Sequence, residues 1–183
     1  MRRSSDETKA VILAAARERF GAVGFQGATI RAIAADAGID PAMVMRYYGS
    51  KDKLFAAAAE FDLRFPDFAA MDPAQVGRSL VGHFLERWEG DEALVILLRS
   101  SATNGEAAQR MQEIFGTQIR PLVASFVPPQ DVGVRAGLIA TQILGMALCR
   151  FVLRLPPVVE MSRDEIVDSL GPTIQRYLGL PEG

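Results

Sequence analysis

Three helix-starting residues in close succession constrain this chain most. Thr29, Asp40 and Ser50 each precede a helical pattern, and each side chain can accept a hydrogen bond from the free amides of a first helical turn. Pro41 fits the first turn of the middle helix, where a missing amide costs nothing. Gly38 can adopt the left-handed conformation that ends a helix. This segment therefore predicts two short helices around a glycine turn, with a third helix after them.

The middle helix, from Pro41 to about Tyr48, is short and has few positions that can face a core. Val44 and Tyr48 lie four residues apart, so both can face inward. Small and long flexible side chains beside an arginine suit entry into the major groove of DNA and contact with phosphates. The side chains left outside are those of Ala42, Met43, Met45, Arg46 and Tyr47. This arrangement predicts a helix-turn-helix, although methionine also fills core gaps and both methionines could serve there.

The residues around this motif keep a specific order and spacing. They run from Phe20, Gly24-Phe25 and Thr29-x-Arg31-x-Ile33-Ala34-x-x-Ala37-Gly38-Ile39 to Tyr48-x-Ser50-Lys51-x-x-Leu54. The pattern resembles the N-terminal domain of the TetR family of bacterial transcriptional regulators. The close match covers roughly residues 8–55, and the remainder is similar to the family only in being helical.

The resemblance implies roles for individual residues. In the family, the threonine that opens the second helix and the lysine that opens the fourth contact phosphates, and these positions are Thr29 and Lys51 here. The third helix, 41–47, is similar to the recognition helix, in which Met43 and Arg46 are candidates for base contacts. The full set of DNA-binding candidates is Thr29, Arg31, Asp40, Ala42, Met43, Arg46, Tyr47 and Lys51.

The third helix departs from the family pattern at two places. The frequent leucine-tyrosine pair is Val44-Met45 here, and a frequent histidine is Tyr47. A phosphate-binding tyrosine is therefore absent at position 45, and Tyr47 is the candidate to replace it. The departure leaves open an alternative of another class, a small-molecule binding protein of the same fold without sequence-specific DNA binding.

The charge distribution supports a basic DNA-reading segment. The whole chain has a formal net charge of −2, which argues against a globally basic nucleic-acid binder. Residues 1–55 nevertheless carry nine Lys and Arg against six Asp and Glu, whereas the remainder carries 11 against 16. This modest asymmetry favours a basic head on an acidic body.

Composition also indicates in which cellular compartment the protein is expected. Hydrophobic residues make up 49% of the chain, so intrinsic disorder is not expected. A single cysteine, Cys149, allows no internal disulfide and fits a reducing cytoplasm. No signal peptide is visible, and the apolar stretch 136–155 is interrupted by polar side chains that argue against a membrane span. We therefore expect a cytoplasmic protein with no membrane partner.

Helical patterns extend over the whole chain and predict an all-α protein of nine to ten helices. We expect a helix-turn-helix DNA-binding domain at 1–50 and a larger helical ligand-binding and dimerisation domain at 51–183. Ser4 and the Ser162-x-x-Glu165 capping box start the first and last helices, and Asp131 is expected to cap the helix 131–155. The first helix is expected to end near 21–24, and further helices are expected at 51–66, 73–90, 91–101, 105–126 and 131–155. The helix 105–126 is expected to break near Gly116 and Pro121, and Pro156-Pro157 is expected to be a linker.

The helix predicted at 131–155 carries small residues every four positions. Such a ridge allows close approach of another helix, and the rest of the helix is apolar almost all round. The helix is therefore either the core of a monomer or also the surface for a second copy. The resemblance implies a homodimer built from the last two long helices. The interface candidates are Gly137, Thr141, Gly145, Cys149, Ile174 and Tyr177.

A small-molecule effector site is also implied by the resemblance, among the middle helices and usually apolar. Ordinary core packing is the competing interpretation for each large side chain there. The ligand-binding candidates are Phe61, Phe65, Phe84, Trp88, Met111, Phe115 and Gln142, with Gln118 and Arg99 as further polar groups.

Catalysis and metal binding have little support in the sequence. His83 is the only histidine, so neither a metal cluster nor a histidine-based triad is expected, and no cofactor is implied. The sequence thus favours a TetR-like regulator that is not an enzyme, acting as a repressor on a dyad-symmetric double-stranded DNA operator and released by a small apolar effector.

Overall fold

A computed structural model describes residues 4–90 and 92–181 of the 183-residue chain. Within these ranges every regular element is a helix and no strand occurs, which confirms the predicted all-α class. The chain forms two compact units, Met1–Phe61 with Glu92–Met111 and Asp62–Asp91 with Gln112–Gly183. The division into domains at residue 50 stays a prediction, because compactness of contacts does not test independent folding.

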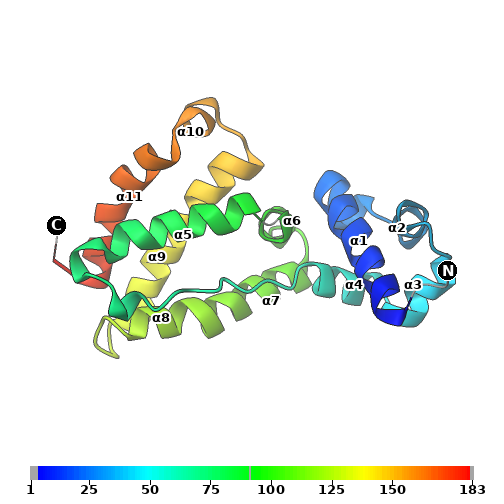
Figure 1. The fold of residues 1–183 in the computed structure, drawn as a ribbon, viewed down its shortest axis with the longest axis horizontal. Helices are drawn as coiled ribbons and strands as arrows, with labels where there is room; N and C mark the ends of the chain where they lie inside the picture. The colour runs from blue at the N-terminus through cyan, green and yellow to red at the C-terminus, as the bar shows by residue number, and fades with distance from the viewer. Residues whose placement is uncertain (1–3, 91, 182–183) are drawn as a thin grey trace. The chain divides into compact units, whose positions relative to one another are not determined.

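The first unit contains the four N-terminal helices together with α6, which packs on α1 (Figure 1). α7 begins in this unit. The helix bounds are α1 (Ser5–Gly27), α2 (Ile30–Ala37), α3 (Pro41–Tyr48), α4 (Lys51–Ala58), α6 (Glu92–Ser101) and α7 (Gly105–Ile114).

An aromatic cluster holds the N-terminal helices together. The ring of Phe20 on α1 meets that of Phe55 on α4 edge to face, with centroids 5.0 Å apart, and Phe25 meets Phe55 at 5.1 Å. Phe20 and Ile33 are fully buried. Such rings supply large apolar area with defined geometry, so they fix the angles at which the short helices meet.

The second unit contains α5, the two π-helical turns η3 and η4, and the C-terminal helices. α5 and α11 lie side by side (Figure 1). The bounds are η1 (Phe68–Ala70), η2 (Pro73–Gln75), α5 (Val76–Gly90), η3 (Phe115–Ile119), α8 (Arg120–Ala124), α9 (Val132–Ala147), η4 (Leu148–Val152), α10 (Pro156–Glu160) and α11 (Arg163–Leu178).

α5 and α11 cross in direct backbone contact at two glycines. A Cβ on Gly77 would lie 2.5 Å from the carbonyl oxygen of Gly171, so no larger residue fits there without movement. Gln175, which is 3% exposed, closes the crossing: its Oε1 accepts from the amide of Gly77 at 2.6 Å, and its Nε2 donates to the carbonyl of Pro73 at 2.6 Å. The two helices therefore form one tightly packed pair.

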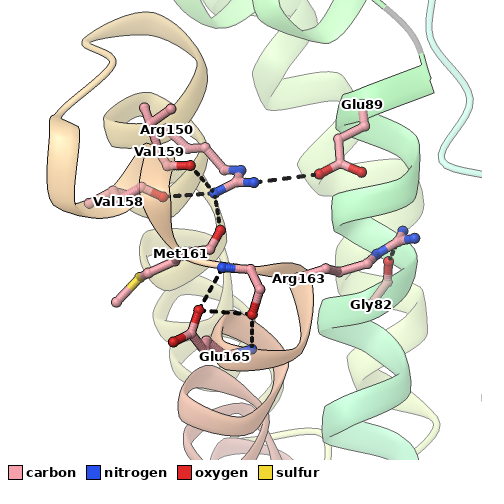
Figure 2. Close-up of polar contacts among 9 residues, drawn as sticks. Gly82, Glu89, Arg150, Val158, Val159, Met161, Arg163 and Glu165 are labelled. Carbon is pink, nitrogen blue, oxygen red and sulfur yellow. Dashed lines mark hydrogen bonds and ion pairs between the residues drawn. The ribbon is translucent and has the colours of Figure 1, made fainter.

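The connection from α9 to α11 is fixed by arginine contacts with backbone carbonyls (Figure 2). The guanidinium of Arg150, on η4, donates to the carbonyls of Val158 at 2.7 Å and Met161 at 3.0 Å. The same guanidinium lies 3.9 Å from the carboxylate of Glu89 on α5. These carbonyls end the short helix α10, where a cation also suits the helix dipole.

Two predicted helix bounds were wrong. α4 ends at Ala58, not near 66, and the following chain has no regular structure up to η1, with Leu63 buried between two exposed neighbours and Arg64 at φ 49°. The predicted end of the first helix near 21–24 is confirmed by Gly24, whose φ of 70° and ψ of 175° break the helical backbone inside α1. Pro156 begins α10 and is not a linker, since proline is tolerated in a first helical turn.

The caps were predicted with mixed success. Both capping boxes are present, at Ser4 with Glu7 and at Ser162 with Glu165. Asp131 precedes α9 but makes no side-chain cap bond. The predicted interruption of the helix 105–126 is confirmed as the π-helical turn η3, which joins α7 to α8.

The segment Val132–Val152 is long and apolar enough to cross a membrane by length and composition alone, with a mean hydropathy of 1.6. Its polar residues therefore do not exclude a span by composition, contrary to the expectation from the sequence. Core helices of soluble proteins, which are mostly buried, meet the same criteria, and 28% of the qualifying 18-residue window is buried within the chain.

Candidate nucleic-acid interface

The helix-turn-helix forms as the three caps predict. The hydroxyl of Thr29 accepts from the amide of Ala32 at 3.1 Å, and the carboxylate of Asp40 accepts from the amide of Ala42 at 2.7 Å. Ser50 accepts from the amide of Lys53 at 3.0 Å. The turn between α2 and α3 is left-handed at a glycine with φ 63°. The sequence thus fixes the start of each short helix through bonds to its own first turn.

α3 keeps a single residue in the core. Val44 is fully buried and is the only buried residue of this helix, while Met45 is 41% exposed. Ala42 and Arg46 are exposed, and Met43 is half-buried. An outward face that includes an arginine and a methionine can enter a groove, because neither side chain is needed to hold the helix in place.

The phosphate-contact candidates are accessible and keep free donors. Thr29 is exposed, and a hydroxyl that accepts one bond still has its own hydrogen to donate. Arg31 is exposed on α2. Lys51 is half-buried, with its ammonium 4.3 Å from the centroid of the Phe25 ring. Asp40 is exposed and its carboxylate caps α3, so the observed role of Asp40 is structural.

The end of α3 is tied to α1 by two tyrosines. The hydroxyl of Tyr48 donates to the carbonyl of Lys9 at 3.2 Å, and burial raises the pKa of that phenol above its ordinary value of 10.0. The ammonium of Lys9 lies over the ring of Tyr47, 5.9 Å from its centroid. Tyr47 is half-buried and Lys9 is exposed. The two tyrosines therefore differ: one anchors the helix and the other borders its outer face.

An ion pair fixes α2 against α1. The guanidinium of Arg19 donates to both carboxylate oxygens of Asp36, at 2.7 and 2.6 Å. These hydrogen bonds lower the pKa of Asp36 and raise that of Arg19. Arg17 donates to the carbonyl of Ala58 at 3.0 Å, which ties α1 to the end of α4. Both arginines are thus engaged in holding helices together.

The ligand-binding candidates divide between the two units. Phe61 and Met111 belong to the first unit, and the others belong to the second. Phe84 and Trp88 are each 3% exposed on α5, and the ring of Phe65 meets that of Phe84 edge to face at 5.6 Å. The remaining candidates, which are half-buried, are Phe115 on η3 and Gln142 on α9.

The polar neighbours have structural contacts. Gln118 accepts from the amide of Leu63 at 2.7 Å, and Arg99 donates to the carbonyl of Gly21. Trp88 stacks on Phe151, a partner that the sequence did not indicate, with centroids 6.0 Å apart and planes 7° from parallel. The indole nitrogen of Trp88 is buried and has no hydrogen-bond partner among the described residues.

The dimer-interface candidates differ in accessibility. Thr141 and Gly145 are exposed on α9, whereas Gly137, Cys149 and Tyr177 are half-buried. Ile174 is 0% exposed within its own subunit, on the side of α11 that packs in the core. A partner cannot reach it, so we leave Ile174 out of any proposed interface.

The lone histidine has a structural environment. Its Nε2 lies 2.7 Å from the carbonyl oxygen of Leu63, and its ring contacts those of Phe65 and Phe68. Within residues 4–90 and 92–181, no group of three or more His, Cys, Asp and Glu side chains could hold a metal ion. His83 therefore holds the extended segment after α4 against α5.

Two family models match the chain. Residues 12–58 match the model described as bacterial regulatory proteins, tetR family, and residues 74–178 match that of the tetracyclin repressor-like C-terminal domain. The HTH-type transcriptional regulatory protein RaaS of Mycobacterium tuberculosis is 31% identical over 157 residues, which is 82% of this chain and 68% of RaaS. The HTH-type transcriptional repressor AcnR of Corynebacterium jeikeium is 34% identical over 87 residues, 46% of each chain.

Solved structures share the fold over nearly the whole chain. A TetR-family regulator from Streptomyces coelicolor A3 superposes with a TM-score of 0.69 at 27% identity, covering 97% of this chain and 98% of the other. NalD of Pseudomonas aeruginosa, described as the secondary repressor of a multidrug efflux pump, gives 0.72 at 21% identity with the same coverage. At that identity the second similarity concerns the fold alone.

Proposed function

The chain belongs to the TetR family of bacterial transcriptional regulators, and we propose that it is a repressor that binds a dyad-symmetric operator as a homodimer and is released by a small effector. The observation that carries the proposal is α3. This helix buries only Val44 and is nevertheless fixed at both ends, by the Asp40 cap and by the glycine turn after Tyr48. A helix with one inward residue and a free outer face is suited to groove insertion.

The alternative without DNA recognition rested on Val44-Met45. Val44 is fully buried, so a valine in place of leucine changes core packing and leaves the outer face untouched. Met45, the second residue that departs from the family pattern, is exposed. Arg46, Thr29 and Lys51 remain accessible beside it, which supports DNA binding with an altered set of contacts and not its loss.

Homodimerisation is supported by an exposed apolar stripe on α9. Val134 is 69% exposed and Leu138 is 38% exposed, and Thr141 and Gly145 continue the same face at the three- and four-residue steps of packed helices. Only 28% of the 18-residue apolar window within Val132–Val152 is buried in the subunit. A second copy would cover this face, and a twofold axis would place two recognition helices on two half-sites.

An effector site in the second unit is supported by Trp88. This buried indole lies against Phe151, and its N–H has no partner in the described part of the chain. We propose that the effector is a largely apolar molecule with a hydrogen-bond acceptor that takes this N–H. If the effector favours a dimer that no longer fits both half-sites, effector and DNA must weaken each other's binding by the same factor.

The proposal is tested by titrating the purified protein against the DNA that flanks its own gene, with a scrambled duplex of the same length. Saturable, salt-dependent binding to one dyad-symmetric segment is expected. Equal weak binding to both duplexes would favour the alternative of a small-molecule binding protein. Because Trp88 is the only tryptophan, quenching of its fluorescence screens effectors in the same preparation. A compound that quenches it should also release the DNA.

Dimerisation has its own test in Gly145→Leu. A Cβ at Gly145 meets no atom of its own subunit within 4 Å, so the variant should fold as a subunit but fail to pair. Gly105→Leu is the control, because that position on α7 is equally open. Sedimentation velocity should give a monomer for the first variant and a dimer for the second. A dimer for both would remove α9 from the interface.

A further inference from the structure

We propose that Lys9 of α1 is a DNA-backbone contact: its ammonium, held over the ring of Tyr47, binds a phosphodiester beside the one reached by the recognition helix. The inference rests on the proposed DNA-binding function and extends the interface to a helix outside the helix-turn-helix. Its chemical target is a phosphate of the duplex, irrespective of base sequence.

Lys9 is distinguished from the other cations of α1 by what they already bind. Arg17 donates to the carbonyl of Ala58, and Arg19 forms the two-bond ion pair with Asp36. Both are therefore occupied in holding helices together. Lys9 is exposed and, among the described residues, has its ring contact with Tyr47 but no carboxylate within ion-pair distance.

The geometry fixes where this cation lies. The backbone of Lys9 accepts the hydroxyl bond of Tyr48 at 3.2 Å, so the turn of α1 that carries Lys9 is tied to the last turn of α3. Its side chain then reaches the ring of Tyr47, with the nitrogen 5.9 Å from the centroid. One residue of α1 is thus joined to two consecutive residues of the recognition helix. Docking of that helix would carry the ammonium to the DNA with it.

The electrostatics also favour a phosphate. A cation over a ring face is attracted by the ring quadrupole but keeps its N–H donors for another partner. The nearest acidic side chains along α1 are Asp6 and Glu7, and the carboxylate of Glu7 is engaged with the amide of Ser4 in the capping box. A phosphodiester carries a full negative charge and could form the ion pair that no carboxylate of the described residues forms with Lys9.

The test compares Lys9→Gln with a control of equal charge change, Arg120→Gln, at an exposed position of α8. Binding to the flanking-DNA segment and to the scrambled duplex is measured by anisotropy at several salt concentrations. The slope of log K against log salt is negative, and each lost phosphate contact reduces its magnitude by about 0.9. A dimer that loses two such contacts should therefore show a slope about 1.8 smaller in magnitude. Between about 50 and 200 mM salt the parent should then lose about tenfold more affinity than Lys9→Gln.

Three further results bear on the assignment. Lys9→Arg should restore the slope, because the charge returns. The slope change should be the same on both duplexes, since a phosphate contact does not read bases. In a Tyr47→Leu background, Lys9→Gln should have a smaller effect, because the ring that holds the ammonium is gone.

The proposal is overturned if Lys9→Gln keeps the parent's slope on DNA that the parent binds, as Arg120→Gln should. It is also overturned if the loss affects the operator segment but spares the scrambled duplex, which would make Lys9 a base-reading residue. Failure of the parent itself to bind either duplex would instead remove the proposed function and this inference with it. The two kinds of failure are therefore distinct.

Discussion

The crossing of α5 and α11 makes a quantitative prediction about two glycines on the same helix. A Cβ on Gly77 would lie 2.5 Å from the carbonyl oxygen of Gly171 and 2.7 Å from the amide nitrogen of Gln175. Both are backbone atoms, so they cannot rotate away and the helices must separate. A Cβ on Gly82, one and a half turns further along α5, would meet only Val167, at an ordinary 3.9 Å.

The free energy of unfolding should therefore change in opposite directions. Overpacking costs about 1–3 kcal/mol, and weakening the bond from the amide of Gly77 to Gln175 costs about 1 kcal/mol more. Alanine gains about 1 kcal/mol over glycine in a helix interior, which leaves Gly77→Ala destabilised by about 2 kcal/mol. Gly82→Ala keeps the helix gain, so it should be stabilised by about 0.5–1 kcal/mol.

Thermal unfolding at matched protein concentration measures both changes. For a chain of this length, about 2 kcal/mol corresponds to a fall in Tm of about 4–8 °C for Gly77→Ala, and Gly82→Ala should melt slightly above the parent. Matching the concentration matters because any dimer adds to the apparent stability. If Gly77→Ala melts at or above the parent, the close backbone contact between α5 and α11 is refuted.

Three more perturbations follow from named contacts. Hydrogen bonds from Arg19 lower the pKa of Asp36 below its ordinary value of 3.8, so the stability that they give is present above pH 3.8 and is lost as the pH falls below it. The Tm of the parent should therefore drop more between pH 6 and 3 than the Tm of Asp36→Asn. Arg150→Met leaves the carbonyls that end α10 without their donor, at a cost of about 1–3 kcal/mol, and should speed amide exchange in 158–162. Ser162→Ala removes a cap and should cost about 1 kcal/mol, with faster exchange confined to the first turn of α11.

Local structure was the part of the fold that the sequence predicted well. The starts of α2, α3 and α4 depend on side chains that bond amides two or three residues ahead, so the information lies within one turn. The end of α4 depends on distant partners. Leu63 is held by Gln118 and His83, from other elements, and these contacts compete with continuation of the helix.

The candidate sites divide in the same way. The outer face of α3 could be predicted because Val44, its only buried residue, and Tyr48, which bonds to α1, lie four residues apart on one short helix. Lys9 could not, since its approach to Tyr47 depends on how the N-terminal helices bring α1 to the end of α3. Ile174 faced the wrong way for an interface because the crossing at Gly171 sets the rotation of α11, and periodicity does not record that rotation.

The most direct test of the regulator account is the ratio of affinities for the flanking-DNA segment and the scrambled duplex, measured for the parent, Arg46→Ala and Lys51→Ala. The account predicts that Arg46→Ala lowers this ratio, because a base contact is lost, by about 1–3 kcal/mol of discrimination per contact. Lys51→Ala should weaken both duplexes alike and reduce the salt slope by about 1 per subunit. If both variants keep the parent's affinities and ratio, α3 is not the recognition helix.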